Sequence, residues 1–152
     1  CMYAGGDKQA DGSVKGWSEY SVSEWQTESV FSLKQDVKIL DEFILKKGVE
    51  SMGDAMKKHQ LHPEDITYFL PHISSVFFKD KLYQEFKNAG LEIAKDKWFI
   101  NLPKVGNVGA ASIYLMLEEL YHSNNLKSGD TIMLSVPESG RFSYAYAFLK
   151  VV

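Results

Sequence analysis

The sequence predicts an α/β fold with a mixed, mostly parallel sheet, helices packed on it and an antiparallel hairpin at the C-terminal end. Helical and strand-like segments alternate from residue 32 to residue 136, which is the pattern of parallel strands joined by helical crossovers. The last two strand-like segments, 131–136 and 142–152, are joined by a short loop, which favours an antiparallel pair. With 152 residues, 45% of them apolar, the chain is long enough for one packed domain.

The N-terminal part of the chain lacks this alternation. Residues 4–16 hold four of the 11 glycines and show no apolar periodicity, so an excursion or a hairpin loop is predicted there. Residues 17–31 mix aromatic and polar side chains without a clean period, which is typical of a short strand or of irregular cover. Little of the core is expected before residue 31.

A long amphipathic helix is predicted next. Ser32 followed by Gln35 resembles a capping box, and apolar residues then recur every three or four positions until about Gln60. These recurring residues are Val37, Leu40, Ile44, Gly48, Met52 and Met56.

Four further elements precede the final strand pair. The β-branched and aromatic run 66–70 predicts a buried strand, and 77–88 returns to helical spacing with Gly90 as a left-handed cap. Residues 98–100 predict another short strand, and residues 107–122 predict a helix whose small residues allow close packing.

Composition and charge exclude several classes of function. The formal net charge of -3 gives no electrostatic reason for a nucleic-acid partner. No apolar run reaches the roughly 18 to 20 residues of a membrane span and no secretory signal is present, so a cytoplasmic protein without a membrane partner is expected. His59, His62 and His122 lack the spacing of metal ligands, and no metal site is predicted.

The single cysteine, Cys1, cannot form an internal disulfide. A cysteine in first position also matches the start of a mature bacterial lipoprotein, but Met2 and Tyr3 make a poor tether. The favoured interpretation is that the natural polypeptide continues upstream of this residue.

Two loops that follow predicted strands carry the candidate chemistry. One places His72 directly after the buried strand, and the other places Asn107 between Gly106 and Gly109 at the start of a helix. If an imidazole N–H and a carboxamide meet at one point, they form a pair of donors suited to a developing oxyanion. Taken singly, a histidine at a strand end is more often a structural hydrogen bonder, and an asparagine at a helix start is more often a cap.

A resemblance to a known family adds to this pattern. The sequence from about residue 31 to residue 152 resembles the C-terminal half of a β-ketoacyl-acyl carrier protein synthase III, a condensing enzyme of the thiolase superfamily. Three segments carry the resemblance, in matching order and spacing: Phe-Leu-Pro-His at 69–72, Val-Gly-Asn-Val-Gly-Ala-Ala-Ser at 105–112, and Leu-Lys-Ser-Gly-Asp at 126–130.

The resemblance implies a division of the chain. Residues 31–152 would form a thiolase-like half-domain, and residues 1–30 a glycine-rich excursion and irregular segment that includes the end of a truncated first strand. That strand is central in the family's sheet, so its loss would leave a gap. The gap would be filled by residues 14–20 or by another chain, or it would stay open and cause self-association or local rearrangement.

The resemblance also implies a site of cysteine, histidine and asparagine, in which His72 and Asn107 take the last two roles. The cysteine carries an acyl group, while the histidine and the asparagine bind the thioester carbonyl of a malonyl unit and stabilise the enolate oxygen as carbon dioxide leaves. The implied substrate-binding residues are Gly106, Gly109, Gly140 and Phe142.

The implied activity is that of an acyltransferase of the 3-oxoacyl-ACP synthase III type, which performs a decarboxylative Claisen condensation in fatty acid or polyketide biosynthesis and needs no cofactor. Its partners would be acyl-CoA or acyl carrier protein thioesters, its own N-terminal half and a second copy in a homodimer. In the family the nucleophilic cysteine starts a buried helix in the N-terminal half, whereas Cys1 precedes a glycine-rich loop. The chain alone is therefore expected to be inactive.

The loop before the last strand departs from the family pattern. The family has a run of glycines there, and within residues 137–142 only Gly140 remains. Glu138 and Arg141 indicate a different acyl group, a specialised synthase or a solvated hairpin turn. Together with the missing nucleophile, this loop favours an alternative function, a non-catalytic thiolase-like domain kept for dimerisation or carrier-protein binding.

Two further features leave alternatives open. Basic residues on the long helix form either a solvated face or a docking surface for an acidic carrier protein. They are Lys46, Lys47, Lys57 and Lys58. An independent α/β hydrolase would need a nucleophile, and no Gly-x-Ser-x-Gly elbow surrounds Ser74 or Ser75.

Overall fold

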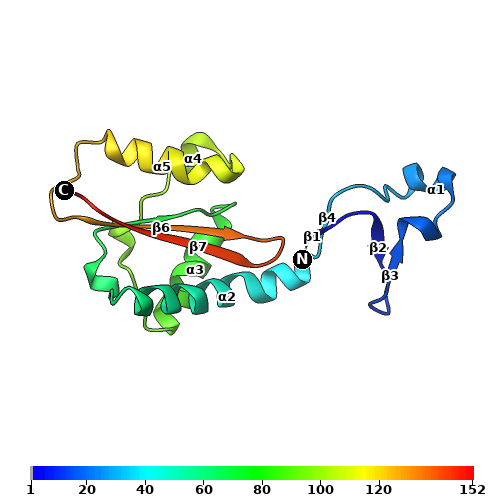
Figure 1. The fold of residues 1–152 in the computed structure, drawn as a ribbon, viewed down its shortest axis with the longest axis horizontal. Coiled ribbons are helices and arrows are strands. Elements are labelled where there is room, and N and C mark those ends of the chain that lie inside the picture. Colours follow the sequence, from blue (N-terminus) through cyan, green and yellow to red (C-terminus); the bar gives the residue numbers. More distant parts are fainter. Residues whose placement is uncertain (1) are drawn as a thin grey trace.

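A mixed three-stranded sheet organises most of the chain in the computed structural model, which describes residues 2–152 (Figure 1). Its order is β5 (Tyr68–Pro71), β6 (Thr131–Glu138) and β7 (Ser143–Lys150). β5 runs parallel to β6, and β6 runs antiparallel to β7. The predicted α/β class with a C-terminal hairpin is therefore confirmed. The expectation about Cys1 as a nucleophile lies outside the described residues.

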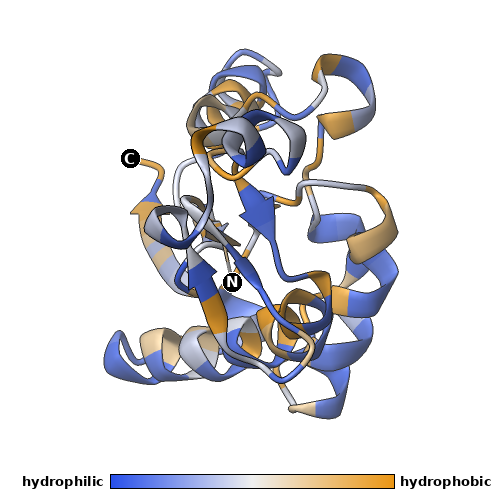
Figure 2. Cartoon of the chain, turned by 90° about the vertical axis from the view of Figure 1, so that its right-hand side faces the viewer, coloured by the Kyte–Doolittle hydropathy of each residue, from blue (hydrophilic) through white to orange (hydrophobic). Residues whose placement is uncertain are grey.

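Helices cover both faces of this sheet. α2 (Val37–Lys58) and α3 (Phe77–Asn88) lie on one face, and α5 (Ser112–Tyr121) lies on the other (Figure 1). Figure 2 looks along the long axis of Figure 1 and shows the strands between helices that carry both hydrophobic and hydrophilic residues. Because side chains alternate along a strand, Phe69 packs into the α2–α3 core while Leu70 packs into the α5 core.

The N-terminal segment projects from the end of the sheet (Figure 1). β1 (Met2–Tyr3) pairs with β4 (Lys34–Gln35), and between them β2 (Gly6–Lys8) and β3 (Val14–Gly16) form the hairpin that the glycine-rich run predicted. The short strand considered for residues 17–31 is wrong, because this stretch contains a 3₁₀ turn and α1 (Val22–Thr27).

The predicted start of the long helix is also wrong. Ser32 and Gln35 do not form its capping box, because Gln35 is held extended in β4 by pairing with β1. The helix begins after Asp36, whose carboxylate accepts the backbone N–H of Ile39 at 3.1 Å and pairs with Lys8 at 2.6 Å. The hydrogen bond from Lys8 lowers the pKa of Asp36, so the cap stays charged.

The short strand predicted over residues 98–100 is absent from the sheet of the described chain. Trp98 makes a single parallel bridge to Phe69, and one backbone bond follows from the Phe99 N–H to the Phe69 carbonyl at 2.8 Å. The Trp98 ring instead packs edge-on against Phe69, with centroids 5.0 Å apart, and its indole N–H donates to the Ile93 carbonyl. Burial of this aromatic side chain, and not strand pairing, explains the apolar run.

The last helix begins five residues later than predicted. Asn107 is not its cap, because Gly109 has a φ of +61°, which an α-helix does not contain. A 3₁₀ turn over Gly109–Ala111 precedes α5, which starts at Ser112. The prediction that Gly90 ends α3 in a left-handed conformation is confirmed by its φ of +71°.

The strands β5 and β6 bond to each other directly, so no open gap separates them. The pairing extends past β5, because the His72 N–H donates to the Ser135 carbonyl at 2.8 Å. Residues 14–20 do not enter this sheet, since β3 pairs with β2 in the projecting segment. None of the helices within residues 2–152 has the length and apolar character needed to cross a membrane.

Candidate functional site

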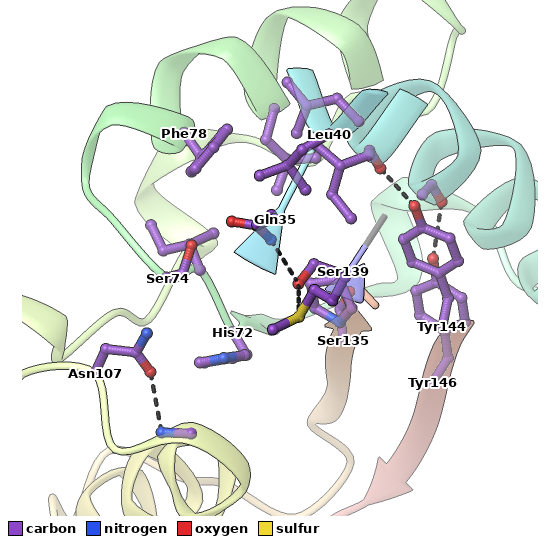
Figure 3. A pocket seen from close by; sticks show the side chains of 18 of the residues that line it. Gln35, Leu40, His72, Ser74, Phe78, Asn107, Ser135, Ser139, Tyr144 and Tyr146 are labelled. Carbon is purple, nitrogen blue, oxygen red and sulfur yellow. Dashed lines mark hydrogen bonds between the residues drawn. The ribbon is translucent and has the colours of Figure 1, made fainter. Parts of the chain in front are cut away.

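A mostly apolar cavity of about 340 Å³ opens between α2, α3, the loop after β5 and the β6–β7 hairpin (Figure 3). Helical side chains form its apolar wall, and strand-end loops supply its polar groups. The apolar wall consists of Leu40, Ile44, Leu45, Phe78, Leu82 and Phe86.

His72 and Asn107 both line this cavity (Figure 3). His72 follows β5, and its backbone bond to Ser135 fixes where the side chain leaves the sheet. Asn107 lies between α4 (Leu102–Val105) and the 3₁₀ turn that precedes α5. Two loops that are distant in sequence therefore bring an imidazole and a carboxamide to one hollow.

Burial sets the protonation of His72. The side chain is half-buried, and the loss of solvation lowers its pKa, so the neutral imidazole predominates at neutral pH. Neutral imidazole offers one N–H donor and one acceptor nitrogen. Among residues 2–152 no side chain or backbone group bonds to the ring, and no fully buried polar side-chain atom there lacks a partner. The ring nitrogens are thus accessible to a ligand.

The carboxamide of Asn107 is oriented by its own loop. Its Oδ1 accepts the Gly109 backbone N–H at 3.0 Å, which assigns the oxygen to that side and leaves the NH₂ group pointing away from Gly109 (Figure 3). The loop bends through Gly106, with a φ of +75°, and through Gly109, both in the left-handed region that favours glycine. The bond to Gly109 therefore leaves both N–H donors of Asn107 unused.

The four predicted substrate-binding residues lie in two places. Gly109 lines the main cavity, and Gly106 borders a smaller hollow on the other side of His72. Gly140 and Phe142 lie in the β6–β7 hairpin, outside the lining formed by the described residues, and the Phe142 ring contacts Phe43 with centroids 6.4 Å apart.

Glu138 and Arg141 are the charged residues of the loop in the β6–β7 hairpin. The Glu138 carboxylate accepts the backbone N–H groups of Gly140 and Arg141, the latter at 3.0 Å, so it stabilises its own turn. Both Glu138 and Arg141 are exposed. This geometry agrees with the interpretation of the loop as a solvated hairpin turn.

Two tyrosines of β7 form a part of the wall that the sequence analysis did not single out. The Tyr144 hydroxyl donates to the Ile44 carbonyl at 2.6 Å, and the Tyr146 hydroxyl donates to the Gly48 carbonyl at 2.8 Å (Figure 3). Burial raises the pKa of each tyrosine to about 12, so both remain protonated donors. The signal was the alternation of aromatic residues along β7, which puts them on the face toward α2.

These tyrosines also explain a glycine in the middle of α2. A Cβ atom at Gly48 would lie 3.0 Å from the Tyr144 ring, so a larger residue at this position would force the ring or the helix to shift. The donor capacity of both hydroxyls is used on α2. Both tyrosines therefore shape the cavity wall, and neither hydroxyl has a proton left to donate to a ligand.

Two other kinds of site were considered from the sequence, a docking surface on α2 and a metal site. The four lysines of α2 are exposed, and Lys47 pairs with Glu50 on the same helix at 2.8 Å. Within residues 2–152 no three histidine, cysteine or acidic side chains gather as a metal site. The cavity is therefore the feature on which a function can be argued.

Comparison with known proteins points to one family. The model of the 3-oxoacyl-[acyl-carrier-protein] synthase III C-terminal family matches residues 56–150. A β-ketoacyl-[acyl-carrier-protein] synthase III of Clostridium novyi is 31% identical over 109 residues, which cover 72% of this chain and 32% of that protein. The enzyme of the same name from Clostridium beijerinckii is 34% identical over 103 residues, covering 66% and 29%. The chain thus spans about a third of the length of these curated relatives.

Solved structures show the same fold. A β-ketoacyl-[acyl-carrier-protein] synthase III from Thermus thermophilus superposes with a TM-score of 0.66 at 21% identity, covering 98% of this chain and 44% of that one. The 3-oxoacyl-(acyl carrier protein) synthase III from Pseudomonas aeruginosa gives a TM-score of 0.66 at 17% identity, covering 80% and 36%.

Proposed function

The chain belongs to the 3-oxoacyl-[acyl-carrier-protein] synthase III C-terminal family, and on that premise we propose that it forms the C-terminal part of an acyltransferase that condenses an acyl thioester with a malonyl thioester. The chain contributes His72 and Asn107 to this reaction. The observation that carries the proposal is that His72 and Asn107, from two loops distant in sequence, line one cavity, and that the NH₂ group of Asn107 takes no part in the bond to Gly109.

The reaction breaks the bond between the malonyl carboxylate carbon and the adjacent carbon. Its electron pair moves into an enolate, whose oxygen gains negative charge as carbon dioxide leaves. The N–H groups of His72 and Asn107 stabilise that oxygen, and the apolar wall strengthens this effect by excluding water. The enolate carbon then attacks an acyl thioester on a cysteine of the N-terminal part, and the cysteine thiolate is released.

The glycines support binding of the substrate in this proposal. Gly106 and Gly109 let the backbone of the Asn107 loop approach the malonyl thioester closely. Gly140 and Phe142 approach the acyl thioester from the β6–β7 hairpin when the complete protein is assembled.

The N-terminal part of the enzyme is the proposed partner of α5. One side of this helix packs on the sheet through Ile113 and Met116, while Tyr114 and Tyr121 on the other side are 71% and 69% exposed. Large exposed aromatic side chains such as these often mark a contact surface, and Glu118 lies exposed between them on the same face. The outer face of α5 therefore suits the part of the enzyme that brings the nucleophilic cysteine. We also propose that the complete protein uses acyl-CoA or acyl carrier protein thioesters as substrates, forms a homodimer and is located in the cytoplasm.

The test uses the complete polypeptide that contains this chain. His72→Ala and Asn107→Ala should each lower the rate of malonyl-thioester decarboxylation by about 100- to 1,000-fold, because each removes one donor to the enolate oxygen. His62→Ala and Asn88→Ala are matched controls, since both residues are exposed and outside the cavity lining. Unchanged decarboxylation by the His72 or Asn107 variant would show the proposal to be wrong.

A second candidate function is a non-catalytic thiolase-like domain for dimerisation or carrier-protein binding. The observation that favours it is the hairpin, where Glu138 and its turn replace the glycine run of the family. The discriminating observation is whether a cysteine begins a helix in the N-terminal part. If none does, a binding assay with acyl carrier protein becomes the relevant measurement.

A further inference from the structure

The Asn107 loop is attached to the first residue of α5. Ser112 is 5% exposed, and its hydroxyl oxygen accepts the backbone N–H of Val108 at 3.2 Å. That N–H belongs to the peptide unit between Asn107 and Val108, and peptide units are planar. The hydrogen bond therefore fixes the orientation of the backbone immediately after Asn107.

Glycines lie on both sides of this point of the loop, at residues 106 and 109. A Cβ atom at Gly106 or at Gly109 would meet no heavy atom within 4 Å, so the side of each glycine where a side chain would stand is open. Glycine also has more backbone freedom than other residues. Between these two flexible positions, the backbone of Asn107 relies on hydrogen bonds to keep one geometry.

The segment before the loop is held by the same helix. Glu119 on α5 accepts the Asn101 side-chain amide at 2.9 Å and pairs with Lys104 at 3.0 Å, which anchors both ends of α4. Helix α5 thus holds the chain on both sides of Asn107, through Glu119 before it and through Ser112 after it.

Ser112 also lies beside the second donor. Ser112, Gly106 and His72 together border the small hollow next to the main cavity. Ser112 therefore lies between the loop that carries His72 and the loop that carries Asn107.

We infer that Ser112 is a positioning residue, which sets the carboxamide of Asn107 at the correct distance from His72 without touching the substrate. This inference rests on the proposed function and deepens it. A displacement of about 1 Å at a reacting group can cost on the order of 100-fold in rate. Loss of the Ser112 hydroxyl should therefore lower the rate while the binding cavity stays intact.

The experiment is a double-mutant cycle in the complete polypeptide, with malonyl-thioester decarboxylation as the assay. Ser112→Ala should lower kcat by about 10- to 100-fold and leave KM within a factor of about 2. In the Asn107→Ala background the same substitution should have no further effect, because Ser112 acts only through Asn107.

The matched control is a serine with the same kind of bond at the other end of α5. The Ser123 hydroxyl oxygen accepts the Asn125 backbone N–H, also at 3.2 Å. Ser123→Ala should leave kcat unchanged. Ser112→Thr, which keeps the hydroxyl, should keep kcat within a factor of about 3 of the unmutated protein.

Each outcome decides a different point. If Asn107→Ala is fully active, the proposed function fails. If Asn107→Ala lowers kcat and Ser112→Ala does not, the proposed function stands and the positioning role is overturned. The same conclusion follows if Ser112→Ala lowers kcat by the same factor in the unmutated protein and in the Asn107→Ala protein. If Ser112→Ala does not fold, the comparison of Ser112→Thr with Ser123→Ala decides, and a large loss of kcat in a folded Ser112→Thr protein overturns the role.

Discussion

Replacement of Asn107 by aspartate exchanges a donor for an acceptor at constant shape. The Asn107 Oδ1 accepts the Gly109 N–H at 3.0 Å, and a carboxylate oxygen accepts the same bond more strongly because it is charged. The NH₂ group on the cavity side becomes a second oxygen. Asn107→Asp should therefore keep or strengthen the local turn while it removes the donors from the cavity.

The expected magnitude follows from two effects at the enolate oxygen. Loss of one oxyanion donor costs about 2.7–4 kcal/mol, a factor of roughly 100 to 1,000 in rate. A carboxylate in place of the amide also puts a negative charge near the developing one, and two unit charges 4 Å apart repel by about 4 kcal/mol at an effective dielectric constant near 20. Asn107→Asp should thus be at least about 10-fold less active than Asn107→Ala.

The relative activities of Asn107→Asp and Asn107→Ala test whether Asn107 is an enolate donor. Decarboxylation of a malonyl thioester by the complete polypeptide is measured for both, with Asn88→Asp as an exposed control. If Asn107 only stabilised its loop through the bond to Gly109, aspartate would preserve that role and alanine would not. An Asn107→Asp protein that is more active than Asn107→Ala would therefore refute the assignment of Asn107 as an enolate donor.

Three further predictions concern stability. Burial lowers the pKa of His72, so the unfolded chain binds a proton more readily than the folded one. The free energy of unfolding should therefore fall as the pH drops below about 6.5, by at most about 1.4 kcal/mol per pH unit. Urea titrations from pH 7 to pH 5 should show a flatter pH dependence of this free energy for His72→Gln than for the unmutated protein. Gly48→Val should lower the free energy of unfolding by about 1–3 kcal/mol because its methyl groups clash with the Tyr144 ring, which urea titration measures against wild type. Asp36→Ala should lower the melting temperature because the long helix loses its cap, whereas Ser32→Ala should leave it unchanged; equal shifts would contradict the helix start described above.

The order of the main elements and the position of His72 after a buried strand were predictable from local patterns. Apolar spacing identified α2, α3 and the final strand pair, and these signals are strong because each element buries one face. His72 follows β5, and a loop at the carboxyl end of a strand lies at the edge of the sheet where ligands bind. Asn107 lines the same cavity although residues 98–100 stay outside the sheet and α4 precedes its loop, so its place does not follow from a strand end.

Features that depend on distant partners were not predictable in this way. Ser32 and Asp36 are both good cap residues, and what decides between them is the pairing of β4 with β1, some thirty residues earlier in the chain. Likewise, Trp98 lies in an apolar run suited to a strand, but its ring is taken up by the core beside Phe69. Local sequence specifies what a segment can form, whereas long-range contacts select among those possibilities.

Asn107 shows how backbone geometry decides between a structural and a chemical role. The side-chain oxygen of an asparagine N-cap accepts a backbone N–H from the first turn of the helix that begins directly after it. Here the left-handed Gly109 interrupts the chain, so α5 starts only at Ser112, and the carboxamide oxygen bonds to the Gly109 N–H within the loop. That bond satisfies the oxygen alone. The two N–H groups take no part in that bond, and Asn107 lines the same cavity as the neutral imidazole of His72, so the carboxamide keeps the donors that the proposed role requires.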